Sequence, residues 1–240
     1  MQVDILAFGA HPDDVELGCS GVLLSAVLQG KKTAVVDLTK GELGTRGTAE
    51  TREEESARAT IILGLSSREN LALPDGFFQI NEENIYKVIK VIRKYKPEII
   101  LCNAPEDRHP DHGRASVLVK EAAFLSGLIK VETYDEIGEL QEAWRPKQIF
   151  HYIQNNYLDP DLIVDISEVY NEKLKSILAY NTQFNVTDDG PQTYISSPEF
   201  LKFIDARAVE FGKRIGVQFG EGFISEKPLG IRSFDNLITE

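Results

Sequence analysis

Three of the four histidines in this 240-residue chain belong to two short acidic segments that are far apart in the sequence. The first segment, residues 10–16, is Ala-His-Pro-Asp-Asp-Val-Glu, and the second, residues 106–112, is Glu-Asp-Arg-His-Pro-Asp-His. Imidazole nitrogens and carboxylate oxygens bind catalytic zinc, which takes three protein ligands and keeps one coordination position open. A carboxylate that is not a ligand can act as a general base toward water at such an ion. The two segments therefore suggest a metal site equipped for hydrolysis.

The spacing within the segments suggests separate roles for their side chains. Residues three apart share a face in helical or turn backbone, so His11 can act with Asp14, and His109 with His112. His11, Asp14 and His112 would supply two nitrogens and one oxygen, a set that suits zinc and equally iron(II). Asp13 must point elsewhere, because adjacent side chains diverge, and it is the candidate general base.

His109 remains on the second segment without a ligand role. We expect Asp111 to orient it and to favour its charged form, because a nearby carboxylate stabilises an imidazolium. A histidinium at this position would stabilise an oxyanion or protonate a leaving amine. The fourth histidine, His151, stands alone in a strand pattern and is expected to be a packed core residue.

Each motif also has a purely structural interpretation. A lone His-Pro-Asp is usually a turn, Asp111 before His112 would usually cap a helix, and Glu16 suits the first turn of a helix. The occurrence of both segments at the ends of apolar runs favours the metal site. Neither cysteine is spaced to join it, and we expect Cys19 to be a small buried residue rather than a reactive thiol.

The elements that must position these segments follow from apolar runs and helical periodicity. We expect strands at residues 3–8, 33–38, 71–73, 98–102, 148–153 and 162–166, and helices at 16–29, 51–63, 82–95, 112–125, 168–180 and 198–215. Strands that are apolar almost throughout are typical of a parallel sheet covered on both faces. The sequence thus predicts an α/β, Rossmann-like fold with a mostly parallel sheet, in a single domain spanning residues 1–240. Ligands of such sheets bind beyond the carboxyl ends of the strands, where both segments begin.

Several local features complete this prediction. Thr51 with Glu54 suggests a capping box, and Ser167 suggests the cap of the helix that follows it. Residues 40–50 form a glycine-rich loop, and residues 185–197 are polar and predict a long surface loop. The tail from Gly220 onward predicts irregular structure, and residues 126–146 give no clear pattern.

Charge and cysteine content exclude several classes of protein. The net charge of -12, from 38 acidic and 26 basic residues, disfavours nucleic acids and anionic membranes as partners and leaves a small molecule as the expected ligand. Two cysteines cannot form a disulfide framework and indicate a reducing compartment. No signal peptide is recognisable, and no apolar run approaches the roughly 18 residues of a membrane span. A cytoplasmic protein is expected.

Residues 10–16 and 109–112 together resemble the two motifs of the LmbE/PIG-L family of zinc-dependent N-acetylglucosamine deacetylases. The resemblance extends over nearly the whole chain, from residues 7–9 to 220–223. It implies a Rossmann-like fold, one zinc per subunit, and in several members a homo-oligomer built from trimers, up to a hexamer. It implies zinc ligation by His11, Asp14 and His112, with Asp13 as base and His109 as the oxyanion or acid group. The implied reaction removes acetate from a 2-acetamido group.

Five fragments look closest to the bacillithiol-pathway branch of the family, which acts on N-acetylglucosaminyl L-malate: residues 37–39, 51–54, 70–75, 106–112 and 221–223. A malyl group carries carboxylates and the protein is acidic, so local arginines must attract it. Arg52 and Arg108 are placed for bidentate carboxylate binding, and Arg207 is a weaker candidate that surface ion pairing would explain equally well. The family also implies a tyrosine near the reacting carbonyl, for which Tyr194 is the candidate.

Other functions remain open at this stage. The substrate could be another aminosugar conjugate, such as a chitobiose-like sugar, a thiol conjugate or a natural product, or the enzyme could be an amidase for a larger acyl group. On the resemblance, Gln183 and Glu221 are candidates for contacts to the sugar or to the ligands. A sugar-binding module without activity would lack some of the expected polar groups. A two-metal phosphoesterase would need more clustered carboxylates.

Overall fold

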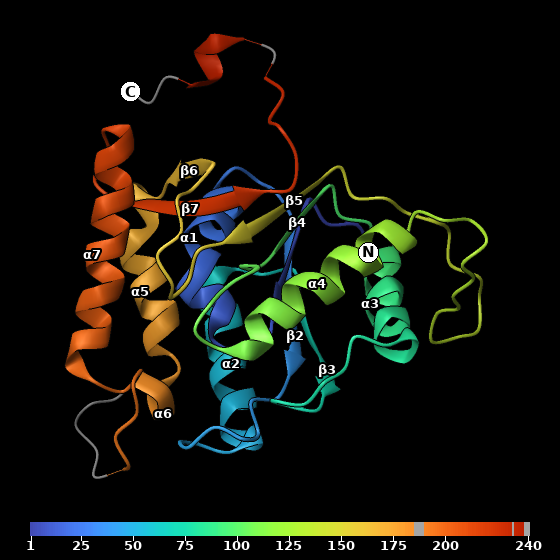
Figure 1. The fold of residues 1–240 in the computed structure, drawn as a ribbon, viewed down its shortest axis with the longest axis horizontal. Helices are drawn as coiled ribbons and strands as arrows, with labels where there is room; N and C mark the ends of the chain where they lie inside the picture. The colour runs from blue at the N-terminus through green and yellow to red at the C-terminus, as the bar shows by residue number, and fades with distance from the viewer. Residues whose placement is uncertain (185–189, 232, 238–240) are drawn as a thin grey trace.

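One seven-stranded sheet forms the centre of the computed structural model, which describes residues 1–184, 190–231 and 233–237 (Figure 1). The strands lie in the order β3-β2-β1-β4-β5-β7-β6. Their bounds are Ile5–Gly9 (β1), Thr33–Thr39 (β2), Ser67–Leu73 (β3), Ile99–Asn103 (β4), Gln148–Tyr152 (β5), Leu162–Asp165 (β6) and Gly220–Ser225 (β7). The first five are mutually parallel, and β7 runs antiparallel between β5 and β6. The predicted α/β fold with a mostly parallel sheet is confirmed.

Helices cover both faces of this sheet (Figure 1). They are α1 (Asp14–Leu28), α2 (Ala49–Leu63), α3 (Glu82–Tyr95), α4 (Pro110–Leu125), α5 (Tyr170–Leu178), α6 (Asn181–Phe184) and α7 (Pro198–Ile215), with short 3₁₀ turns at Ser167–Val169 and Phe234–Leu237. Helices α3 and α4 pack together on one face, and α1, α2 and α5 pack together on the other. None of the described helices is both long and apolar enough to cross a membrane.

Strand β1 shows why apolar and polar residues do not alternate along these strands. Leu6 and Phe8 belong to the core beneath α3 and α4, whereas Ile5 and Ala7 belong to the core beneath α1. Successive side chains of a strand point to opposite faces, so a strand covered on both sides must be apolar at every position. Burying a side chain such as Phe8 contributes about 1.5–3 kcal/mol.

The first six residues of the tail that we predicted to be irregular, Gly220–Ser225, instead form strand β7. Its glycines lower its strand propensity, but a Cβ at Gly222 would lie 2.8 Å from the ring of Phe211, on α7. The glycine therefore allows the helix to approach the strand closely. Hydrogen bonding to β5 on one side and β6 on the other outweighs local propensity, as is usual for strands.

Two predicted helix caps are also corrected. Thr48 caps α2, because its Oγ1 accepts from the Thr51 backbone N–H at 3.2 Å while the Thr51 hydroxyl oxygen accepts from the Thr48 N–H at 2.7 Å. Ser167 opens a 3₁₀ turn instead of capping α5, and its hydroxyl donates to Asp165. Of the predicted surface loop 185–197, residues 185–189 lie outside the described residues.

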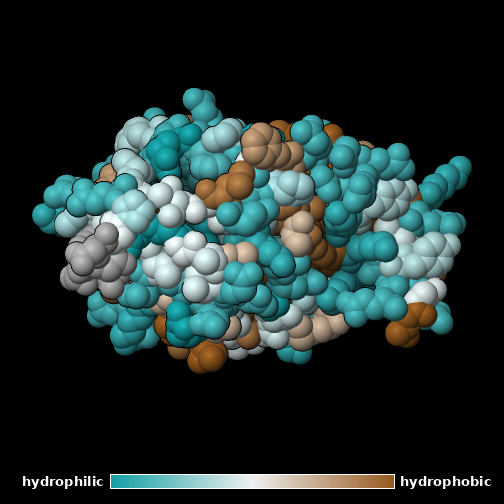
Figure 2. All heavy atoms as spheres, turned by 90° about the horizontal axis from the view of Figure 1, so that it is seen from below, coloured by the Kyte–Doolittle hydropathy of each residue, from teal (hydrophilic) through white to brown (hydrophobic). Residues whose placement is uncertain are grey.

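Strands β1 and β4 are adjacent and parallel, with Ala7 opposite Leu101. Their carboxyl ends therefore open at the same edge of the sheet, and the two histidine-containing segments follow directly. This face of the molecule, seen from below in Figure 2, is mostly hydrophilic, and its apolar side chains are scattered.

Candidate active site

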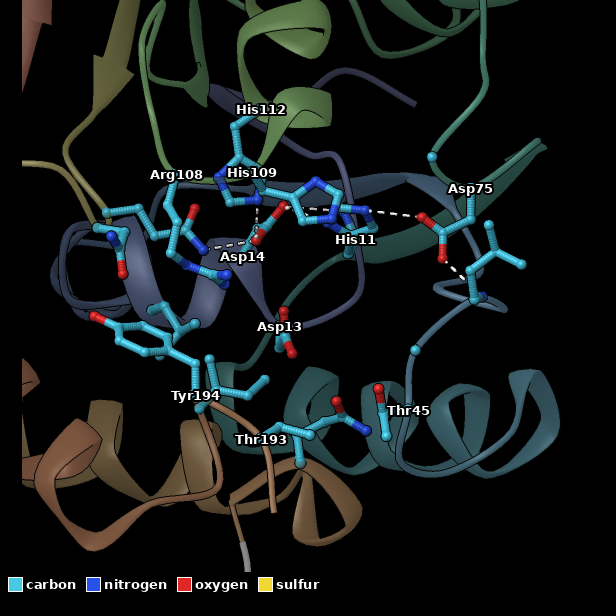
Figure 3. Close-up of a pocket in the computed structure, with 18 of the residues that line it drawn as sticks. His11, Asp13, Asp14, Thr45, Asp75, Arg108, His109, His112, Thr193 and Tyr194 are labelled. Carbon is cyan, nitrogen blue, oxygen red and sulfur yellow. Dashed lines mark hydrogen bonds and ion pairs between the residues drawn. The ribbon is translucent and has the colours of Figure 1, made fainter. Parts of the chain in front are cut away.

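The two segments meet above the carboxyl ends of β1 and β4. His11 precedes α1, while His109 and His112 lie at the start of α4, and one nitrogen from each of the three lies within 4.8 Å of the others (Figure 3). The carboxylate of Asp14 contacts two of them: Oδ2 lies 3.5 Å from His11 Nδ1, and Oδ1 lies 3.2 Å from His112 Nε2. The structure therefore brings the predicted ligand set together, and all of its members are buried.

Other carboxylates contact the second ring nitrogen of His11 and of His112. His11 Nε2 lies 3.0 Å from Asp75 Oδ1 and 3.3 Å from Asp111 Oδ2, while His112 Nδ1 lies 2.6 Å from Asp107 Oδ2. Each ring thus turns one nitrogen to Asp14 and the other to a second carboxylate. Histidines that bind metals typically donate their outer N–H to such a partner, which fixes the tautomer and the ring orientation.

The charges in this cluster fit a divalent cation. Burial lowers the pKa of His112, but Asp14 and Asp107 outweigh it and raise the value to about 9. Burial opposes the negative charge of Asp14, yet the charges and hydrogen bonds of His112 and His11 hold its pKa well below the usual range. Two nitrogens and one oxygen that attract positive charge match the donor set of zinc or iron(II).

Asp13 points away from this set and into the pocket, as its position next to Asp14 predicts (Figure 3). It is the N-cap of α1 and has φ 112°, a left-handed conformation that costs a non-glycine residue about 1–3 kcal/mol. Such strain clusters at functional sites. Burial raises the pKa of Asp13 to about 7, although the guanidinium of Arg52 lowers it.

Arg52 lines the pocket, but both terminal nitrogens of its guanidinium donate to the protein itself. It is buried, and its Nη2 donates to Asp13 Oδ2 at 2.8 Å and to the carbonyl oxygen of Pro12. Its Nη1 donates to the carbonyl oxygen of Gly41 at 3.4 Å. Gly41 has φ +64°, and a Cβ there would lie 2.1 Å from Nη1, so only glycine admits the guanidinium. Arg52 therefore holds the strained turn that carries Asp13.

Replacing Arg52 with methionine should lower the free energy of unfolding by about 3 kcal/mol, because the Asp13 carboxylate and two carbonyl oxygens lose their buried donor. Urea denaturation at neutral pH measures this change. Arg58→Met, an exposed arginine on the same helix, is the matched control and should change stability by at most about 0.5 kcal/mol. Equal stability of the two variants would contradict this role for Arg52.

The other two arginines lie in different places. Arg108 is exposed and lines the pocket, with its guanidinium carbon 4.6 Å from the centre of the Tyr194 ring, which also lines the pocket. Arg207 does not line this pocket: its Nη2 donates to the carbonyl oxygen of Leu17 at 3.2 Å, and its guanidinium carbon lies 5.4 Å from the Phe203 ring centre. Burial lowers the pKa of Arg207 to about 10.

His109 is not oriented by the Asp111 carboxylate, contrary to our expectation. That carboxylate contacts His11, accepts from the Gly76 N–H at 2.8 Å and pairs with Arg114 at 2.5 Å. The backbone N–H of Asp111 instead donates to His109 Nδ1 at 3.2 Å, so the ring proton lies on Nε2. Burial and the nearby positive charges of His11 and His112 lower the pKa of His109 to about 4, which keeps it neutral rather than charged.

Several contributing residues escaped the sequence analysis. Asp75 lies in the turn after β3, and its Pro-Asp-Gly context indicated only a turn. Its position beyond a third strand end was the one signal that could have pointed to the site. Asn103, the last residue of β4, and Gln154, which follows β5, both contact Asp14 and gave no sequence signal.

Two further candidates have different outcomes. Gln183 lines the pocket, where its Nε2 donates to the Arg46 carbonyl oxygen at 2.8 Å. Glu221 is buried outside the pocket and accepts from the backbone N–H groups of Gly21 and Val22, both at 2.8 Å, and from Lys173 at 2.7 Å. The structure thus places Glu221 against α1 and not at a sugar.

The pocket itself has a volume of about 460 Å³. The three histidines and Asp13 line it together with Thr45, Phe77, Thr193 and Tyr194. Figure 3 shows Thr45, Thr193 and Tyr194 across the pocket from the histidines. This size is typical of small-molecule sites, and polar groups converge at one end. The arrangement suits a metal-assisted hydrolysis of a neutral polar substrate group.

Comparisons with known proteins give the following similarities. Residues 6–123 match the family PIG-L, described as GlcNAc-PI de-N-acetylase. The chain is 37% identical over 169 residues to the uncharacterized deacetylase YaiS of Escherichia coli K12, covering 64% of this chain and 83% of YaiS. It is 29% identical over 229 residues to the diacetylchitobiose deacetylase of Thermococcus kodakarensis, covering 91% of this chain and 81% of that protein.

A solved structure agrees over almost the entire fold. The crystal structure of the conserved protein TT1542 from Thermus thermophilus is similar with a TM-score of 0.86 and 35% sequence identity. The similarity covers 96% of this chain and 97% of that chain.

Proposed function

This chain belongs to the PIG-L/LmbE family and is an N-deacetylase, and on that premise we propose that it removes the acetyl group from the 2-acetamido group of an N-acetylglucosamine conjugate. The observation that carries the proposal is the cluster of His11, Asp14 and His112 beside an unliganded carboxylate, Asp13, at the floor of one pocket. The family description and the chitobiose deacetylase both concern N-acetylglucosamine compounds.

In this proposal His11, Asp14 and His112 hold one Zn²⁺ or Fe²⁺ ion. Such an ion supplies Lewis-acid polarisation of the amide carbonyl and of water. Asp13 takes a proton from the attacking water while the water oxygen bonds to the carbonyl carbon. Asp13 then gives a proton to the amide nitrogen as the C–N bond breaks. The products are acetate and the free amine.

His109 contributes as a hydrogen-bond donor. Its Nδ1 accepts the backbone N–H of Asp111, so its Nε2–H is available to the pocket. A donor there can stabilise the negative charge that develops on the carbonyl oxygen. A neutral donor needs no partner carboxylate of its own, which agrees with the contacts of Asp111 to His11.

We infer that the conjugate carries a carboxylate, and we propose N-acetylglucosaminyl L-malate, an intermediate of bacillithiol biosynthesis, as the substrate. Arg108 supports this proposal because its side chain has no hydrogen bond or ion pair among the described residues. Its fork geometry is suited to bidentate binding of a carboxylate.

A chitobiose-like sugar is the second candidate. The similarity to a diacetylchitobiose deacetylase favours it, as do two exposed aromatic rings that line the pocket, Phe77 and Tyr194. An apolar ring face can pack against a second sugar ring without any charge.

The homo-oligomeric state, trimer or hexamer, and the cytoplasmic location stay predictions.

Replacing Arg108 with alanine separates the two substrates. We expect kcat/KM for N-acetylglucosaminyl malate to fall about 10- to 100-fold, the effect of losing a hydrogen bond to a charged group, with diacetylchitobiose turnover nearly unchanged. Acetate release measures both. Arg145→Ala, whose guanidinium packs on Phe124, is the control.

Three other outcomes of this experiment would change the proposal. Equal losses for both substrates would favour a neutral conjugate. No acetate release by the wild-type enzyme from either compound would refute the substrate class. Faster hydrolysis of a larger acyl amide, such as a cysteinyl amide of the same sugar, would identify an amidase.

A further inference from the structure

Two buried side-chain amides meet the carboxylate of Asp14. Asn103 Nδ2 donates to Asp14 Oδ2 at 3.1 Å, and Gln154 Nε2 donates to Asp14 Oδ1 at 2.6 Å. Asn103 is completely buried and Gln154 is 7% exposed. Each oxygen of the carboxylate therefore has one amide donor in addition to its histidine contact.

Neighbouring contacts fix which end of each amide faces Asp14. The Asn103 oxygen accepts the backbone N–H of Ala10 at 2.9 Å, so its nitrogen must turn toward Asp14. The same nitrogen lies 3.3 Å from the oxygen of Gln154, and this contact turns the Gln154 nitrogen toward Asp14 as well. Because a flipped amide would leave buried groups without partners, the orientation is determined by the contacts themselves.

The two amides come from the sheet, whereas Asp14 belongs to a helix. Asn103 is the last residue of β4, and Gln154 follows the end of the neighbouring strand β5. Asp14 is the first residue of α1. The sheet edge thus holds a carboxylate on the first turn of α1, a turn that also contains the strained backbone of Asp13.

We propose that Asn103 and Gln154 are positioning residues that hold the Asp14 carboxylate in its metal-binding orientation before an ion arrives. The proposal rests on the proposed function, which makes Asp14 a ligand. Amides suit this task because they donate hydrogen bonds without titrating, and they leave both oxygens negatively charged. An arginine or lysine in their place would compete with the metal ion for the same charge.

The test compares zinc affinity in variants at the two ends of β5, one at the start of the strand and one just after its end. Gln154→Met removes the donor and keeps a chain of similar length, and Gln148→Met makes the same change at the opposite end of β5. Competition with a chromophoric chelator should show zinc binding about 10- to 100-fold weaker in Gln154→Met, the usual effect of losing an outer partner of a ligand, and unchanged in Gln148→Met. Gln154→Asn, whose shorter amide no longer reaches Asp14, should behave like Gln154→Met.

Cobalt(II) provides a readout that a loss of general stability would not change. Co²⁺ bound in place of zinc has visible absorption bands that depend on the arrangement of the ligands, so these bands should shift in Gln154→Met but not in Gln148→Met. Identical affinities and spectra in wild type and Gln154→Met would overturn the positioning role while leaving the metal site intact. Failure of the wild-type protein to bind zinc or cobalt would overturn both this inference and the proposed function.

Discussion

Asp13→Asn is expected to lower kcat by about 10²- to 10⁴-fold, the contribution of a general base, while the metal content and KM change little. Asparagine has the same shape as aspartate, and its oxygen can still accept the Arg52 hydrogen bond. It cannot take a proton from water. The separation of Asp13 from Asp14, which contacts His11 and His112, is the reason that metal binding should survive.

Initial rates of acetate release and elemental analysis of the same preparation measure this prediction. Asp4→Asn, a change of the same kind near the N-terminus and far from the pocket, is the control and should have wild-type rates. Wild-type kcat in Asp13→Asn would refute the base assignment. A loss of metal together with activity would show instead that Asp13 helps to hold the ion.

Removal of the metal ion is expected to reduce acetate release to background, and added Zn²⁺ or Fe²⁺ should restore it. Two histidines and one carboxylate suit both ions, so the ion whose addition restores acetate release is the one that supports the activity. Elemental analysis of protein purified with and without oxygen would show which ion is present in each case. Full activity of demonstrably metal-free protein would refute the metal-dependent mechanism.

Two histidine variants test the metal requirement by substitution of a proposed ligand. His112→Gln should lose stoichiometric metal and activity, since its Nε2 faces Asp14. His151→Gln should keep the metal, because His151 is fully buried on β5 and contacts Glu226 Oε1 at 2.8 Å, which confirms its predicted place in the core. Loss of metal in both variants would mean that the effect of His112 is one of stability alone.

The parts of the fold that the sequence predicts are those where each strand is buried on both faces. Residues 3–8 and 33–38 are apolar at nearly every position, and β1 and β2 lie there with shifts of one or two residues. Strand β7 escaped prediction because its glycines serve a contact with Phe211 that only the folded chain reveals. The N-cap of α2 was misplaced by three residues, because Thr48 and Thr51 each accept from the other.

The candidate site also contains residues that the sequence predicts and residues that it does not. His11, Asp14 and His112 could be predicted as ligands because two segments rich in histidine and carboxylate both follow apolar runs that read as strands. Asp75 and Gln154 are ordinary residues of turns and loops, and only the sheet order brings them to the cluster. Arg52 was predicted to bind a substrate carboxylate because a sequence cannot show that its two terminal nitrogens already donate to Asp13 and to two carbonyl oxygens.

The contact between Glu221 and α1 has a consequence for biosynthesis. Glu221 accepts the backbone N–H of Gly21 across a sequence separation of 200 residues, and its strand is inserted between β5 and β6. A nascent chain completed as far as α7 already contains every residue of the proposed metal site, but not β7, the strand that joins the edge strand β6 to the five parallel strands. Contacts of such long separation form late, because loop closure must precede them. The enzyme should therefore become active only after β7 has left the ribosome. Premature termination before Gly220 should yield chains that need chaperones or are degraded.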